Sequence, residues 1–298
     1  MAARVTRSAS RAASSTSDDA SRCLLLALSH DELGVIVDGL ADPLQPVVAV
    51  ALSSTCLGLR TPLLAALEVL KVRHEKAVAL CRKLAKSCAG VRGAERLVGH
   101  LAADDAATLA MILRTNGLPC LRDLYLGGNG LGDAGVQALC EGLGRGTAPS
   151  LRILSLGHNK FGPAGAEALA AALCRGAFPK LEVLCIHRNP IGSQGVASLA
   201  AQLRKMPALT KLFLDGCENG DEGVASLVGN LGKDDFKALQ HLELSHNRIT
   251  DAGMAKLLAA LEAGGLTKLV NQPFLLLGNP ASAVAVQAVK AALVKRSH

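Results

Sequence analysis

From residue 121 onward, leucines recur in a fixed pattern. Five segments superimpose, and their starts are separated by 30, 30, 28 and 30 residues; they begin at Leu121, Leu151, Leu181, Leu209 and Leu239. Each segment carries LxxLxLxxN, with Cys replacing Asn once, followed by a glycine and two leucines at helical spacing. The LxL alternation has the two-residue period of a β-strand, and leucines four apart share one face of a helix. The pattern therefore predicts one short strand and one helix in each segment.

A single strand and helix cannot bury their apolar faces alone, so neighbouring segments must stack. We expect an α/β fold in which a right-handed solenoid follows an α-helical N-terminal region. Its short parallel strands lie inside, on a concave face, and its helices lie outside. A buried polar residue follows each strand, and we expect its side chain to hydrogen-bond the backbone of its own coil and of the next coil. These residues are Asn129, Asn159, Asn189, Cys217 and Asn247.

Each predicted helix has a glycine near its start, and three have an acidic residue there. The glycines are Gly135, Gly165, Gly195, Gly223 and Gly253. Asp133, Asp221 and Asp251 lie close to the helix starts, where a carboxylate stabilises free amide groups.

This combination resembles the ribonuclease-inhibitor class of leucine-rich repeats. Relatives with repeats of that class include the Ran GTPase-activating protein and the sensor arms of NOD-like receptors. The resemblance implies a stacked repeat domain that binds another protein.

The chain divides into three predicted parts. Residues 1–22 read as a disordered basic tail rich in Ser, Ala and Arg, residues 23–100 as a helical N-terminal region, and residues 101–298 as the repeat domain. A degenerate C-terminal cap begins at about residue 271. Before the first repeat, DDAATLAMILRTNGLP reads as the helical half of an opening repeat.

The N-terminal region contains a long predicted helix, from Thr61-Pro62 to about Lys86, with Thr as cap and Pro at the first position. Residues 28–60 resemble an F-box, the module that ties substrate receptors to cullin ubiquitin ligases. The matching pieces are Asp31-Glu32-Leu33, Ile36, Leu40, Asp42-Pro43-Leu44, Thr55-Cys56 and Arg60. The resemblance implies a Skp-type adaptor as partner. The alternative is a helical cap on the open end of the solenoid.

Composition and charge narrow the classes of partner. The chain has no Trp, one Tyr and five Phe, so the core must be aliphatic. The net charge is +7, yet residues 101–280 carry equal numbers of basic and acidic residues. Nucleic-acid binding needs a concentrated basic face, so we expect no nucleic-acid partner. The sequence has no apolar run long enough for a membrane span.

The cysteines and the first residues bear on location. Nine cysteines are scattered singly, without a CxxC pair, which indicates reduced thiols and a cytoplasmic protein. The first 17 residues are basic and rich in Ser and Ala, which fits either an organellar transit peptide or a disordered tail. Nuclear or organellar import therefore stays open.

Motifs for catalysis are not evident. Gly130, Gly132 and Gly135 satisfy GxGxxG, a spacing typical of dinucleotide binding. However, Gly135 is the repeat glycine, and the other segments lack the remaining two glycines. We expect no nucleotide, cofactor or metal, and no enzymatic activity.

Residues between the strand leucines, and the loop residues after them, should form the binding surface. We predict a patch centred on Tyr125, Ile153, Cys185 and Phe213, because aromatic and apolar anchors ringed by polar groups are typical of interfaces. Ordinary sheet-surface packing is the alternative. The full set of predicted contact residues is Tyr125, Ile153, Ser155, His158, Val183, Cys185, His187, Arg188, Phe213, Asp215, Glu243 and His246.

Three functions fit these patterns. The first is a non-enzymatic protein–protein interaction module, a monomer that binds a protein partner of unknown identity on its concave face. The second is an F-box-like substrate receptor of a cullin ubiquitin ligase. The third is a regulator of a small GTPase, by resemblance to the Ran GTPase-activating protein.

Overall fold

The computed structural model describes residues 57–84, 96–98, 101–115, 118–270 and 275–295. The chain forms two compact units, residues 1–41 with 45–72, and residues 42–44 with 73–298. The second unit contains the repeats. The predicted tail and nearly all of the F-box-like segment lie outside the described residues.

Helix α4 (Leu57–Leu84) is the long helix predicted before the repeats. It begins at Leu57, so the predicted start at Thr61-Pro62 is wrong. Pro62 lacks an N–H and costs the helix one backbone bond, yet a helical turn precedes it. In the second unit, Ala77, Leu80 and Cys81 of this helix are buried in the hydrophobic core.

Six parallel strands form one sheet in chain order, as the repeat pattern predicts. They are β1 (Arg96–Val98), β2 (Asp123–Tyr125), β3 (Ile153–Ser155), β4 (Val183–Cys185), β5 (Lys211–Phe213) and β6 (His241–Glu243). The central leucines pair in register along the whole sheet; they are Leu97, Leu124, Leu154, Leu184, Leu212 and Leu242. The sheet thus begins before residue 101, the predicted start of the repeat domain.

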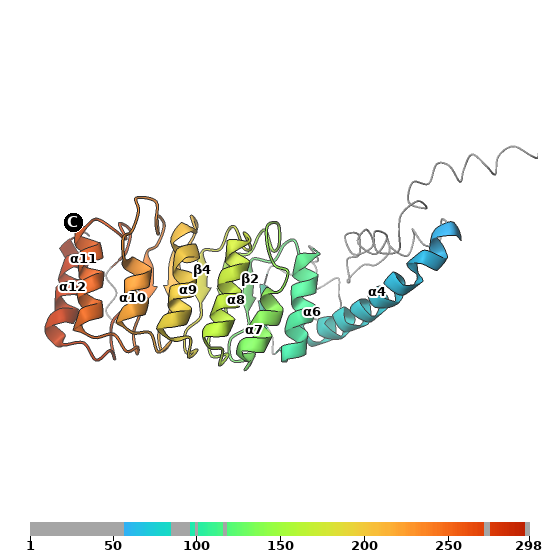
Figure 1. Cartoon of the computed structure of the whole chain (residues 1–298), viewed down its shortest axis with the longest axis horizontal. Coiled ribbons are helices and arrows are strands. Elements are labelled where there is room, and N and C mark those ends of the chain that lie inside the picture. The colour runs from blue at the N-terminus through green and yellow to red at the C-terminus, as the bar shows by residue number, and fades with distance from the viewer. Residues whose placement is uncertain (1–56, 85–95, 99–100, 116–117, 271–274, 296–298) are drawn as a thin grey trace, which may run out of the picture. The chain divides into compact units, whose positions relative to one another are not determined.

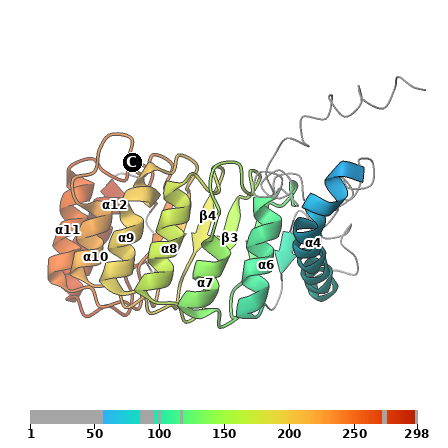
Figure 2. The ribbon, with the colours of Figure 1, turned by 45° about the vertical axis from the view of Figure 1, so that its right-hand side comes forward.

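A helix follows each strand and packs against the helix of the next coil (Figure 1). The helices that follow the strands are α6 (Ala103–Arg114), α7 (Gly132–Cys140), α8 (Pro163–Cys174), α9 (Gly192–Lys205), α10 (Asp221–Val228) and α11 (Asp251–Glu262). Helix α12 (Ala283–Lys295) comes after α11 without a described strand between them. Figure 2 shows these helices side by side in one layer with strands behind them. The repeat unit is therefore an α/β solenoid, with α6 as the predicted helical half of the opening repeat.

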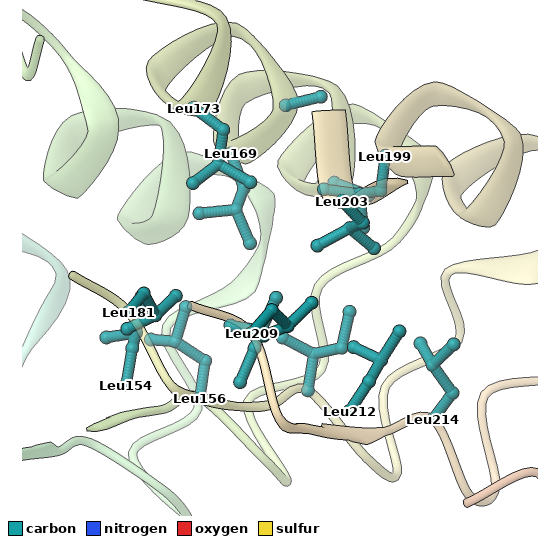
Figure 3. Close-up of a cluster of buried hydrophobic side chains, with 14 of the residues drawn as sticks. Leu154, Leu156, Leu169, Leu173, Leu181, Leu199, Leu203, Leu209, Leu212 and Leu214 are labelled. Atoms are coloured by element: carbon teal, nitrogen blue, oxygen red, sulfur yellow. The ribbon is translucent and has the colours of Figure 1, made fainter. Parts of the chain in front are cut away.

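The core between the two layers is aliphatic. Figure 3 shows Leu169 and Leu173 of α8, and Leu199 and Leu203 of α9, facing the leucines of the strand layer. Burial of each such side chain stabilises the fold by about 1.5–3 kcal/mol. Three phenylalanines are also fully buried; they are Phe161, Phe178 and Phe236. The prediction of a core made almost wholly of Leu, Val, Ile and Ala is confirmed.

A ladder of buried asparagines joins the coils. The side-chain nitrogen Nδ2 of Asn159 donates to the carbonyl of Leu156 in its own coil, at 2.9 Å, and to that of Leu126 in the preceding coil, at 2.7 Å. Its Oδ1 accepts from the backbone N–H of Asn129 at 3.1 Å. The predicted bond to the next coil is wrong in direction. Among the described residues the Leu126 carbonyl receives no backbone donor, so it is available to the following coil.

The acidic residues at the helix starts likewise act between coils. Oδ1 of Asp133, in α7, accepts from the N–H groups of Gly162 and Gly165, at 2.8 and 2.7 Å, where α8 begins. Asp221 and Asp251 do the same for the next coil. These carboxylates therefore stabilise the start of the following helix, rather than that of their own. A Cβ on Gly165 would lie 2.9 Å from Asp133 Oδ1, so glycine allows this close approach.

Replacing Asp221 by alanine is expected to lower the free energy of unfolding by about 1–2 kcal/mol. Its carboxylate accepts from the N–H groups of Thr250 and Gly253 and from the Thr250 hydroxyl, at 2.6 to 3.0 Å. Urea denaturation followed by circular dichroism measures the change. Asp234→Ala is the control, because that exposed carboxylate forms a long ion pair with Lys237, at 3.7 Å, and accepts from no helix start among the described residues. Equal effects of the two substitutions would contradict the role of Asp221.

Candidate functional site

The alternation of each strand places its central leucine in the core and its two neighbours on the opposite side of the sheet. We call this side, which faces away from the helices, the strand face. Parallel pairing aligns the exposed positions of successive coils in two rows. One row is Asp123, Ile153, Val183, Lys211 and His241. The other is Tyr125, Ser155, Cys185, Phe213 and Glu243.

A hollow of about 400 Å³ opens where the third and fourth repeats meet the loop after β3. It is lined by His158, Cys185, His187, Arg188, Phe213 and Asp215. All six were predicted as contact residues. Strands β4 and β5 supply Cys185 and Phe213, while the loops that follow β3, β4 and β5 supply the other four. The structure thus concentrates half of the predicted residues around one feature.

Two histidines from successive coils form part of this hollow. The rings of His158 and His187 lie edge to face, with their centroids 5.5 Å apart. The His187 ring also covers Gly157, and a Cβ on that glycine would collide with the ring, 2.8 Å from its Nδ1. A side chain at position 157 would therefore displace His187. Sequence reasoning overlooked Gly157, although the corresponding positions in the next three coils carry His187, Asp215 and Ser245.

The remaining predicted residues lie on the strand face but outside the hollow. Tyr125, Ile153, Ser155, Val183 and Glu243 occupy the two rows, each half-buried, and His246 lies exposed in the loop after β6. Of the four residues at the predicted patch centre, the hollow includes two. Cys185 and Phe213 line the hollow, whereas Tyr125 and Ile153 do not.

Burial makes the cysteine of the hollow unreactive. It raises the pKa of the Cys185 thiol to about 11, with the Asp215 carboxylate adding to the effect and Lys211 opposing it. The thiolate is the nucleophilic form of cysteine, so Cys185 stays protonated at neutral pH. Its contribution to the hollow is that of a small apolar group.

The His187 pKa is lowered below the ordinary histidine value. Burial is the largest cause, and the nearby His158 and Arg188 act in the same direction, while the Asp215 carboxylate opposes them. Asp215→Asn is therefore expected to lower the His187 pKa further. Proton NMR of the imidazole through a pH titration measures both values, and Asp234→Asn provides a remote control. A His187 pKa above the ordinary value, or one that Asp215→Asn raises, would contradict this electrostatic explanation.

Two glycines at the turn into α7 have left-handed backbones. Gly130 and Gly132 have φ of 64° and 61°, a conformation that favours glycine, and a Cβ on either would meet no atom within 4 Å. Gly135 instead packs against Leu131 inside the repeat, as expected for the repeat glycine.

Metal sites, disulfides and membrane spans are absent from the described residues. In that part of the chain, no group of three or more His, Cys, Asp or Glu side chains is arranged to hold a metal ion. In the described ranges, Cys120, Cys140, Cys174, Cys185 and Cys217 are free thiols. None of the helices there has the length and apolarity needed to cross a bilayer.

Comparison with known proteins agrees with the repeat geometry. A family model described as "Leucine Rich repeat" matches residues 117–140, 147–170 and 238–258. The matches fall on the first, second and fifth of the predicted segments. A search of curated protein sequences finds no match. Together with the stacked coils, the matches show that this chain contains leucine-rich repeats.

Proposed function

We propose that the chain is a non-catalytic interaction module that binds a protein partner on its strand face, with the hollow as the centre of contact. The observation that carries the proposal is the grouping of Phe213, Cys185 and Arg188 with two histidines in one open depression. Interfaces favour an aromatic anchor and an arginine at their centre, surrounded by polar groups. Leucine-rich repeats support this role, because stacked coils present one continuous surface.

We also propose that the repeats are of the ribonuclease-inhibitor type. In support, the coils recur every 28 to 30 residues from Leu121, and each contains an α-helix of 8 to 14 residues. The F-box-like role of residues 28–60 and the regulation of a small GTPase stay predictions. Co-purification of a Skp-type adaptor, lost on deleting residues 23–60, would test the first of these. A GTP hydrolysis assay with candidate GTPases would test the second.

Phe213→Asp is expected to reduce partner recovery about tenfold or more, because it places a charge at the proposed central anchor. The measurement is quantitative affinity purification of the full-length chain from its native cells. Ala197→Asp, on the exposed outer side of α9, is the matched control and should leave recovery unchanged. Circular dichroism and thermal unfolding must confirm that both variants fold. A folded Phe213→Asp variant that recovers every partner at the original level would refute the proposal.

A further inference from the structure

The residue before each ladder position has a left-handed backbone in all six coils from β2 onward. In three of these coils it is glycine, namely Gly128, Gly216 and Gly278, with φ of 75°, 61° and 72°. In the other three it is His158, Arg188 and His246, with φ of 57°, 52° and 54°. Glycine adopts this conformation without steric strain, whereas a residue with a Cβ does not. Three coils therefore carry an arginine or histidine side chain at a position whose left-handed backbone favours glycine.

Two of these three side chains, His158 and Arg188, line the hollow, and His187 lies between them. Lys211, next to Phe213 on β5, acts electrostatically on Cys185 in the same hollow. The opposing charge is the carboxylate of Asp215, which acts on His187 and Cys185. The hollow is thus lined by one cation and two imidazoles against one carboxylate, with the Lys211 cation beside it on β5.

Among the described residues, Arg188 and Lys211 have no carboxylate partner. Throughout the described ranges, no ion pair joins Arg188 or Lys211 to an acidic side chain. Other arginines near the same loops and strands are paired, Arg152 with Glu182 at 3.2 Å and Arg248 with Glu218 at 2.7 Å. The charges of two proteins are complementary across a specific interface. A partner of this surface should therefore place acidic groups opposite Arg188 and Lys211.

We propose that the hollow binds an acidic peptide segment of the partner. A carboxylate side chain contacts Arg188 and the two histidines, and an adjacent apolar side chain packs on Phe213 and Cys185. Arginine suits this role because its planar guanidinium presents paired donors to a carboxylate. The inference rests on the proposed function, since it names the chemistry of the partner at the same site.

A phage-displayed library of random 12-residue peptides, selected on the immobilised full-length chain, tests the inference. Selection on the Phe213→Asp variant in parallel removes peptides that bind elsewhere. We expect the enriched peptides to carry Asp or Glu beside an aromatic or aliphatic residue. Enrichment of peptides that depend on Phe213 but lack acidic residues, or are basic, would overturn the acidic partner and leave the interaction function standing. If no enriched peptide depends on Phe213, both the acidic partner and the binding of peptide segments at the hollow are overturned.

The role of Arg188 is tested with a synthetic peptide of the enriched sequence, by titration calorimetry. Arg188→Gly restores the residue that the backbone favours, so the variant should fold, and its affinity should fall about tenfold or more. Replacing the acidic residue of the peptide by its amide should cost about the same, without a further loss on the Arg188→Gly variant. Arg248→Ala, which removes an arginine already paired with Glu218, is the control and should leave the affinity unchanged. Additive losses, or an unchanged affinity of Arg188→Gly, would overturn the proposed contact.

Discussion

Replacing Asn189 by alanine is expected to lower the free energy of unfolding of the repeat unit by about 2–4 kcal/mol. Asn189 is fully buried. Its Nδ2 donates to the carbonyls of Leu156 and Ile186, at 3.0 and 2.8 Å, and its Oδ1 accepts from the Asn159 N–H at 2.7 Å. Alanine leaves the buried Asn159 N–H without its acceptor. The Leu156 carbonyl keeps Asn159 Nδ2 as a donor, and the Ile186 carbonyl keeps only the weak Cys217 thiol. Because the bonds join neighbouring coils, the loss also weakens the stacking that defines the solenoid.

Urea denaturation of the full-length chain, followed by circular dichroism, measures this loss. Gln194→Ala is the matched control, because its exposed amide lies near the start of the helix in the same coil and donates to the Glu167 carboxylate, at 3.2 Å. That substitution should change the free energy of unfolding by less than about 0.5 kcal/mol. A loss below about 1 kcal/mol for Asn189→Ala would contradict the central role of the ladder.

Asn219→Ile has the opposite expected sign and should raise the free energy of unfolding by about 1–3 kcal/mol. Asn219 is fully buried, and in the described part of the chain its side-chain nitrogen and oxygen have no hydrogen-bond partner. The corresponding positions in the other coils hold buried apolar side chains; they are Leu131, Phe161, Ile191 and Ile249. Isoleucine would remove two unsatisfied polar atoms and restore the apolar contact. The backbone bond from Asn219 N–H to Asn247 Oδ1, at 3.0 Å, would remain.

The reverse substitution, Ile191→Asn, is the matched comparison one coil earlier. It should destabilise the chain by an amount at least as large, because it buries an amide and removes an apolar side chain that is fully enclosed. Thermal and urea unfolding of both variants give the comparison. Destabilisation by Asn219→Ile would show that the buried amide is satisfied.

Much of the fold could be predicted because each repeat must bury the apolar faces of its strand and its helix against the neighbouring repeats. The LxL alternation and the helical leucine pair fix a strand, a helix and their shared core side. The opening strand β1 was missed because Arg96–Val98 is followed by Gly99, where the other strands have their second core residue. The direction of the asparagine and aspartate bonds could not be predicted, since the same spacing fits either neighbouring coil. The burial of Asn219 was not predicted, because this residue lies in a run of polar residues that is typical of a loop.

The alternation of strand residues predicts which of them lie on the strand face, but it does not predict where that face is hollowed. Alternation assigns residues to a face without saying which loops rise beside them. The contact between His158 and His187 joins the loops of two successive coils. It depends on the left-handed backbone of His158 and on the space that Gly157 leaves for the His187 ring. The absence of an ion pair at Arg188 among the described residues likewise depends on where its neighbours' carboxylates point. These are properties of the folded coils and have no local sequence pattern.

Binding of a protein partner at the hollow on the strand face is tested most directly by site-specific photo-cross-linking. A benzophenone amino acid is placed at Phe213 in one chain and at Gln194, on the exposed side of α9, in another. We expect a discrete protein adduct from position 213 and none from position 194, with the adduct lost in the Arg188→Gly background. An adduct from position 194 alone, on the helix side of the sheet, would contradict binding at the hollow.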